Sequence, residues 1–133
     1  WHEIIQIIFS FDAAIKCRIN AEDYLNNFMP CPGKIETLNT PGGPNVRVDT
    51  HIYQGYEIPP YYDSLLGKII TFGRNRQEAL KTMRRALGEF TIGPIKTTIP
   101  FHIQLLDNSQ FVKGDFSTHF VQETLKEEPK QEE

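Results

Sequence analysis

Arg18 is the residue whose type and surroundings most clearly suggest chemistry. Lys16 and Asn20 flank it at a spacing of two residues. A guanidinium is permanently charged and offers a planar fork of donors, so Arg18 is suited to holding an anion. It could equally form a structural ion pair with Glu22 or Asp23, because structural pairs outnumber catalytic arginines. The residues alone leave both interpretations open.

Asp63 is a second candidate, in the string PPYYDS at 59–64. The two prolines restrict the local backbone and hold the following residues on an extended or turning chain. A carboxylate held there could organise a site. It could also simply cap a turn, by accepting a hydrogen bond from the backbone.

Other catalytic patterns are missing from the sequence. It has no glycine-rich nucleotide loop of the GxxxxGK[ST] or GxGxxG type, and TPGGPNVR at 40–47 predicts a plain turn. The histidines lack the spacing of metal ligands and are expected on the surface or in packing: His2, His51, His102 and His119. We therefore predict no metal site. Cys17 and Cys31 are too few for a disulfide framework and are expected to be reduced thiols.

A strand must position Arg18, because Ile15, Cys17 and Ile19 alternate with the polar residues around it. That period of two predicts a half-buried strand, whose polar face presents Lys16, Arg18 and Asn20. Further strands are predicted at 34–38, 46–53 and 65–72, separated by turns rich in proline and glycine.

Three helices are expected after these strands. The first runs from 76 to 90, with Asn75 as its N-cap, Glu78 completing a capping box, and Gly93–Pro94 as its stop. The second covers 100–106, with Thr97 or Thr98 near its cap and with Asp107 and Asn108 at its end. A short third helix is predicted at 118–126. Strands first and helices later favour an α+β domain with a mostly antiparallel sheet and flanking helices.

The composition is ordinary for one soluble domain: 133 residues, of which 39% are hydrophobic and 23% are charged. A net charge of −3 argues against nonspecific nucleic-acid binding and against a polybasic membrane surface. The apolar run at 4–9 is too short to cross a bilayer and lacks the features of a signal peptide. We therefore expect a cytoplasmic protein without nucleic-acid or membrane partners.

Several strings resemble the C-terminal domain of biotin carboxylases, the subunits of acetyl-CoA carboxylase and related biotin-dependent carboxylases. They are CRINAED at 17–23, PGKI at 32–35, the long string at 41–74 that begins PGGPNVR, and IKTTIPFH at 95–102. The resemblance covers residues 13–120. Residues 1–12 are an unmatched lead-in, and 121–133 are a charged tail expected to be disordered.

The resemblance implies a ligase that uses ATP and bicarbonate to carboxylate carrier-bound biotin, as in fatty acid biosynthesis. It implies that Arg18 contacts bicarbonate and the ureido oxygen of biotin, with Asn20, Glu22 and Asp63 as possible supporting residues. Arg47 matches a segment involved in homodimer contacts. ATP and Mg²⁺ would be bound by an upstream ATP-grasp region or subunit, and the biotin by a biotin carboxyl carrier protein. This chain alone is therefore expected to be inactive.

The sequence departs from the family at two positions. Lys16 stands where the family has glutamate, and residues two apart on a strand share a face, so a cation lies beside Arg18. Pro94 stands where the family has glycine. Two functions remain open: the C-terminal portion of a working carboxylase, and a truncated, noncatalytic interaction module that pairs with a full-length carboxylase.

Overall fold

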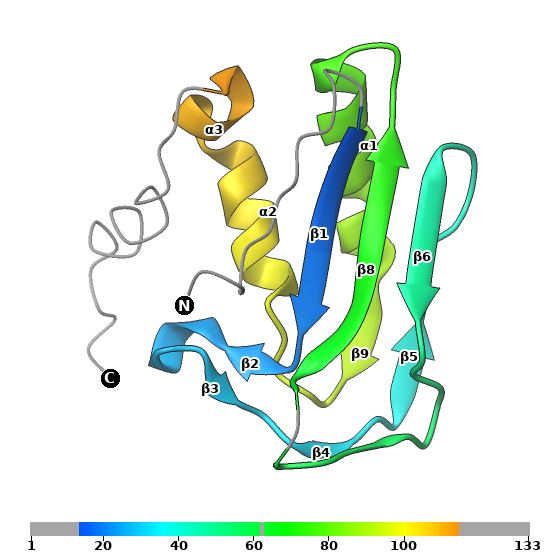
Figure 1. The fold of residues 1–133 in the computed structure, drawn as a ribbon, viewed down its shortest axis with the longest axis vertical. Coiled ribbons are helices and arrows are strands. Elements are labelled where there is room, and N and C mark those ends of the chain that lie inside the picture. The colour runs from blue at the N-terminus through cyan, green and yellow to red at the C-terminus, as the bar shows by residue number, and fades with distance from the viewer. Residues whose placement is uncertain (1–13, 62, 115–133) are drawn as a thin grey trace.

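The structure is a computed structural model that describes residues 14–61 and 63–114. It is an α+β domain in which every paired strand is antiparallel, which confirms the predicted fold class (Figure 1). The strands are β1 (Ala14–Asn20), β2 (Glu22–Asp23), β3 (Met29–Pro30), β4 (Gly33–Lys34), β5 (Thr37–Asn39), β6 (Val46–Thr50), β7 (Glu57–Ile58), β8 (Leu65–Phe72) and β9 (Thr91–Gly93). The helices are the 3₁₀ helix η1 (Tyr24–Asn26) and the α-helices α1 (Arg76–Glu89), α2 (Ile99–Asp107) and α3 (Ser109–Lys113).

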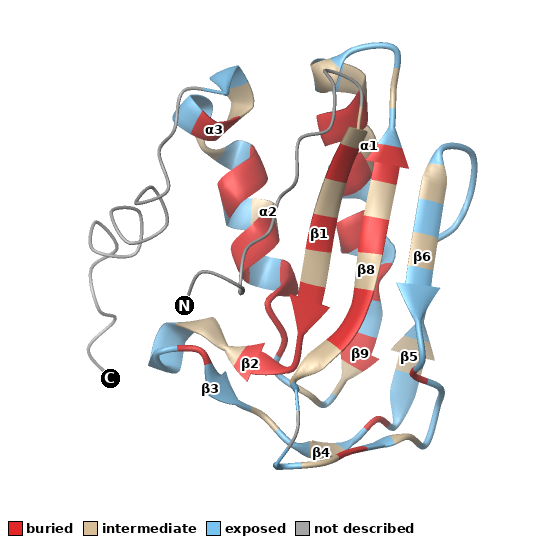
Figure 2. Ribbon diagram, viewed as in Figure 1, coloured by how far each residue is buried: buried red, intermediate tan, exposed pale blue. Residues whose placement is uncertain are grey.

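The main sheet has three strands in the order β1-β8-β6. From Ala14 to Ile19 the residues of β1 alternate between half-buried and buried, as the sequence pattern predicts, but Asn20 is buried as well (Figure 2). Ile15, Cys17 and Ile19 are buried, and α1 and α2 lie against that face of the sheet. Lys16 and Arg18 alternate with these buried residues and so lie on the opposite face, which none of the described helices covers (Figure 1).

The first predicted helix is confirmed. Asn75 Oδ1 accepts a hydrogen bond from the Glu78 nitrogen at 2.9 Å, which satisfies a donor of the first turn. The Glu78 carboxylate reaches back to the Arg74 nitrogen at 2.8 Å rather than to that of the cap residue. The helix ends at Glu89, before the predicted stop, because Thr91–Gly93 pairs with β5 as β9.

The second predicted helix is α2, which ends at Asp107 with Asn108 as its C-cap, as expected. Thr98 occupies the N-cap position, but its side chain makes no capping hydrogen bond. Asn108 also begins α3, which the sequence did not predict, by accepting from the Gln110 nitrogen at 2.9 Å. The predicted helix at 118–126 and the predicted disordered tail lie outside the described residues.

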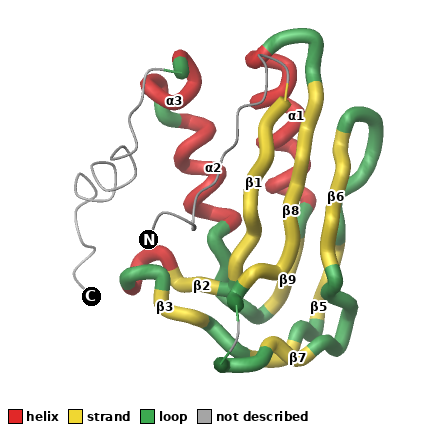
Figure 3. The backbone as a smooth tube through the Cα atoms, in the orientation of Figure 1, coloured by secondary structure: helices red, strands yellow, loops and turns green. Residues whose placement is uncertain are grey.

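The strand predicted at 34–38 is two strands in the structure. The Ile35 nitrogen donates to the Tyr56 oxygen, and the Glu36 nitrogen donates to the Gly93 oxygen. The chain therefore changes partner at this point, from β7 to β9. Such short strands gather at the end of the main sheet where β1 finishes (Figure 3). The strand predicted at 46–53 ends at Thr50.

Candidate functional site

The uncovered face of the main sheet carries a cluster of cations around Arg18. Cross-strand register places Lys68 opposite Arg18, with Asp49 opposite Lys68 on the far strand. The adjacent row consists of Lys16, Ile70 and Arg47. Directly opposed like charges on a sheet repel each other, so Arg18 and Lys68 together favour the approach of an anion.

Arg18 is half-buried and forms no ion pair with any other described residue. Its Nε is buried and has no hydrogen-bond partner within the described ranges. The two carboxylates expected to pair with it are engaged elsewhere: Glu22 bonds neutral side chains, and Asp23 pairs with Lys96 at 2.9 Å. The structural ion pair that competed with the anion-binding interpretation is thus not formed.

Asn20 and Glu22 are buried, at 4% and 6% exposure, rather than presented on the open face with Arg18. The β1–β8 register shifts between Ile19 and Asn20, which marks a bulge at this point. Asn20 Nδ2 donates to Glu22 Oε1 at 3.0 Å, and the Ser64 hydroxyl donates to the same oxygen. Asn20 Oδ1 and Glu22 Oε2 are buried without a partner in the described part of the chain.

Asp63 is exposed, and its Oδ1 accepts from the Leu65 nitrogen at 3.0 Å. That contact is the turn-capping role that the sequence left open. The neighbouring Ser64, unlike Asp63, bonds the segment that follows β1. Its hydroxyl donates to Glu22, and its carbonyl accepts from the Ala21 nitrogen at 2.8 Å. The sequence pattern did not single out Ser64 for this role.

Arg47 lies on β6, away from β1 but on the same face of the sheet. Its Nε donates to Asp49 Oδ1 at 3.0 Å, and both side chains are well exposed. Since β8 separates the two strands, the structure does not bring Arg47 into contact with Arg18.

His102 is a residue of this region that sequence reasoning missed. It is 1% exposed on α2, and its Nε2 lies 2.7 Å from the Arg18 carbonyl oxygen. Burial lowers the pKa of His102 to about 4, although the bond to the Arg18 carbonyl acts in the opposite direction. The signal that could have revealed it is helical spacing, because His102 stands three residues from the apolar Ile99 and Leu105.

Nothing in residues 14–61 and 63–114 groups three or more histidine, cysteine or acidic side chains as a metal site would. Cys17 and Cys31 are free thiols, as expected, and burial raises the pKa of Cys17 to about 12, so it is no nucleophile. Among the described helices, none has the length and apolarity needed to cross a membrane.

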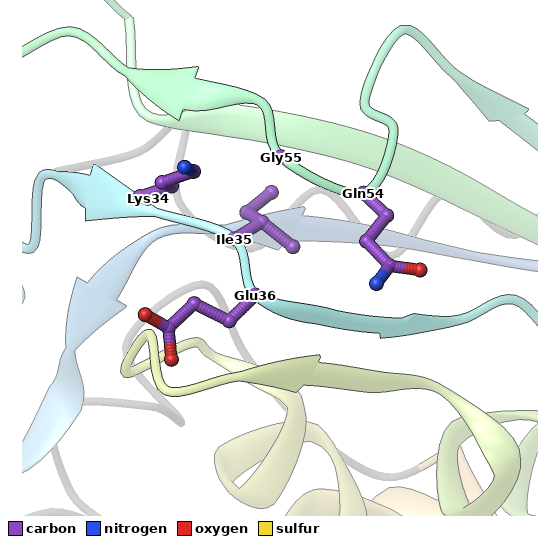
Figure 4. Close-up of a pocket in the computed structure, with 5 residues that line it drawn as sticks. All are labelled: Lys34, Ile35, Glu36, Gln54 and Gly55. Atoms are coloured by element: carbon purple, nitrogen blue, oxygen red, sulfur yellow. The ribbon is translucent and has the colours of Figure 1, made fainter.

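A shallow pocket lies beside the short strand β4. It is lined by Lys34, Ile35 and Glu36 on one segment and by Gln54 and Gly55 on another (Figure 4). The lining includes none of Lys16, Arg18 and Lys68, so the pocket and the Arg18 cluster are separate features.

Comparison with known proteins gives consistent matches. The family model for the biotin carboxylase C-terminal domain matches residues 16–123. Biotin carboxylase 1 of Bacillus subtilis is 56% identical over 109 residues, which are 82% of this chain and 24% of that protein. The biotin carboxylase of a Nostoc species is 53% identical over 113 residues, which are 85% of this chain and 25% of that protein.

A solved structure gives the same result. The biotin carboxylase domain dimer of Hydrogenobacter thermophilus 2-oxoglutarate carboxylase, in complex with MgADP, ADP and bicarbonate, has a TM-score of 0.82 and 41% identity. The match covers 86% of this chain and 26% of that one. The chain therefore spans about a quarter of the length of the curated relatives it matches.

Proposed function

We infer function from the premise that this chain belongs to the biotin carboxylase C-terminal domain family, as the sequence resemblance predicted. We propose that, within a complete carboxylase, it supplies Arg18 to bind bicarbonate and the ureido oxygen of biotin. The observation that carries the proposal is a guanidinium on an uncovered sheet face with a buried, unpartnered Nε and no ion pair among the described residues.

The chemistry of the guanidinium suits this role. Biotin supplies the ureido nitrogen that receives the carboxyl group. Arg18 holds negative charge at the ureido oxygen and at the bicarbonate oxygens, because its donors are planar and its charge is permanent. Lys68, opposite Arg18, adds to the positive potential without forming a planar fork. A donor aimed at developing negative charge contributes about 3–4 kcal/mol in a closed site.

Asn20 and Glu22 support Arg18 in this proposal without touching the anion. They are buried beside the bulge that follows Arg18, and with Ser64 they fix the chain where the sheet register breaks. Asp63 contributes only by holding the turn that leads into β8.

The remaining components of the reaction come from outside this chain. ATP and Mg²⁺ are bound by an ATP-grasp region or subunit, and biotin arrives on a carrier protein.

The test is Arg18→Ala in the complete carboxylase, with Arg85→Ala as control. Arg85 is an exposed arginine on α1 that pairs with Glu89, so its loss should leave turnover unchanged. Arg18→Ala should lower biotin-dependent turnover by about 100-fold or more while ATP binding survives. Turnover within a few-fold of the parent enzyme would refute the role of Arg18.

We also propose that Arg47 contacts the partner in a homodimer. It is exposed on the edge strand β6 and its geometry is held by Asp49. Arg47→Ala should shift the complete carboxylase toward monomer in sedimentation velocity. An unchanged sedimentation coefficient at the lowest measurable concentration would remove Arg47 from the interface.

Lys16 favours a second candidate function, a noncatalytic interaction module. It lies on the same face of β1 as Arg18, where its charge can repel the guanidinium or compete for its anion. Mixing this chain with a purified ATP-grasp fragment separates the two functions. Biotin-dependent ATP hydrolysis supports the working carboxylase. Co-purification with a full-length carboxylase without any such activity supports the module.

A further inference from the structure

The outer edge of β1 at Arg18 is held by α2 rather than by another strand. β1 is an edge strand, so the backbone groups on its outer side have no partner in the main sheet. At Arg18 and Asn20 the start of α2 supplies those partners. The Thr98 nitrogen donates to the Asn20 oxygen at 3.0 Å, and the Asn20 nitrogen donates to Thr98 Oγ1 at 3.1 Å.

The Arg18 carbonyl is held by two side chains of this segment. His102 Nε2 lies 2.7 Å from it, and Thr98 Oγ1 donates to it at 3.5 Å. A carbonyl oxygen can only accept, so the proton of the neutral imidazole must reside on Nε2. Nδ1 is then an acceptor, and it is buried without a partner among the described residues. Among the described residues, the His102 side chain thus makes one hydrogen bond, and that bond goes to Arg18.

This contact lies next to a break in the pairing of β1 with β8. The β1–β8 register is regular up to Ile19 and shifts before Asn20, so the ladder is interrupted one residue beyond Arg18. A shift of the Arg18 backbone would carry the guanidinium with it. Misplacement of a binding group by about 1 Å can cost about 100-fold in rate.

We propose that His102, assisted by Thr98, is a positioning residue that fixes the Arg18 backbone and so aims the guanidinium at its anion. This inference rests on the proposed function of Arg18. His102 does not touch the substrate; it acts through the carbonyl of Arg18. Its proton stays on Nε2 throughout, because transfer would break the bond that holds the strand.

The experiment compares His102→Leu with His102→Gln in the complete carboxylase. Leucine fills the buried space but has no donor, whereas the glutamine Nε2 can replace the imidazole Nε2 as donor to the Arg18 carbonyl. Leu105→Val is the control, since Leu105 is equally buried on α2 and makes no side-chain hydrogen bond to β1. Thermal unfolding identifies any variant that fails to fold. If His102→Leu fails to fold, Thr98→Val, which removes the other side-chain donor to the Arg18 carbonyl, takes its place.

For each variant, kcat and the KM for bicarbonate are measured, and their changes are compared with any change in the KM for ATP. We expect His102→Leu to lower kcat/KM for bicarbonate by between about tenfold and 100-fold, with the KM for ATP unchanged. His102→Gln should recover most of that loss, and Leu105→Val should resemble the parent enzyme. A purely structural role would move both KM values together in His102→Leu and Leu105→Val, and that result would overturn the proposal.

Arg18→Ala, measured in parallel, separates this proposal from the one it rests on. If Arg18→Ala abolishes turnover while His102→Leu matches the parent enzyme, the positioning role is wrong and the role of Arg18 stands. If Arg18→Ala retains turnover, both are overturned.

Discussion

His102 should make the stability of this chain depend on pH in a specific window. Burial lowers the pKa of His102 to about 4 in the folded state, whereas an unfolded histidine titrates near 6.5. Above about pH 6.5 the imidazole is neutral in both states and contributes no pH dependence. Between about pH 6.5 and pH 4 the imidazole is protonated in the unfolded state but stays neutral in the folded state. The free energy of unfolding therefore falls as the pH falls.

The magnitude follows from the difference between the two pKa values. About 2.5 pKa units at 1.36 kcal/mol each give about 3 kcal/mol lost across the window, with a slope near 1.4 kcal/mol per pH unit at its centre. His102 is 1% exposed, so solvent screening does little to reduce this value. The glutamine of His102→Gln does not titrate and should lack this contribution.

Urea unfolding of the 133-residue chain at several pH values between 7.5 and 4.5 measures the effect. The quantity compared is the free energy of unfolding of the parent chain minus that of His102→Gln. It should fall as the pH is lowered from 6.5, while Leu105→Val keeps the slope of the parent chain. A difference that stays flat from pH 6.5 to 4.5 would mean that the imidazole is not buried as the structure has it.

Further predictions concern the stability of the fold at three positions: Glu22 beside the bulge in β1, Gly73 before α1, and Gly88 within α1. Glu22→Ala should destabilise the chain by about 2–4 kcal/mol in urea unfolding, because buried Asn20 and Ser64 lose their shared acceptor. Glu22→Gln keeps that acceptor and should cost about 1 kcal/mol or less; equal losses would contradict the network. Gly73→Ala should destabilise markedly, since its Cβ would lie 2.6 Å from a backbone nitrogen of α1, whereas a Cβ at Gly88 meets open space. Gly88→Ala should therefore be stabilising by about 1 kcal/mol, and a loss of stability there would refute the assigned packing.

The elements that the sequence predicted well are those with local causes. β1 follows from the alternation of Ile15, Cys17 and Ile19, and α1 follows from its cap at Asn75. Each signal lies within the element itself, so no knowledge of distant residues was needed. The same holds for the end of α2 at Asp107.

The features that the sequence predicted wrongly or did not predict depend on residues far away in the chain. The strand predicted at 34–38 is divided because its backbone pairs first near Tyr56 and then with Gly93. Helical spacing predicts that His102 is buried, but its contact with the Arg18 carbonyl, 84 positions away, has no local signal. The burial of Glu22 likewise depends on Ser64, across 42 positions. Long-range pairing therefore decides most of what the sequence could not predict about the site.

That Arg18 has no ion pair among the described residues is itself a consequence of such pairings. Three carboxylates lie near it in sequence or register, and each is engaged with another residue: Glu22 with Asn20 and Ser64, Asp23 with Lys96, and Asp49 with Arg47. If any of them were free to turn toward Arg18, it would neutralise the guanidinium and compete with an incoming anion. If Arg18 binds an anion as proposed, the contacts that hold these carboxylates away from it support that binding. Breaking one of them should weaken binding even though none touches the ligand.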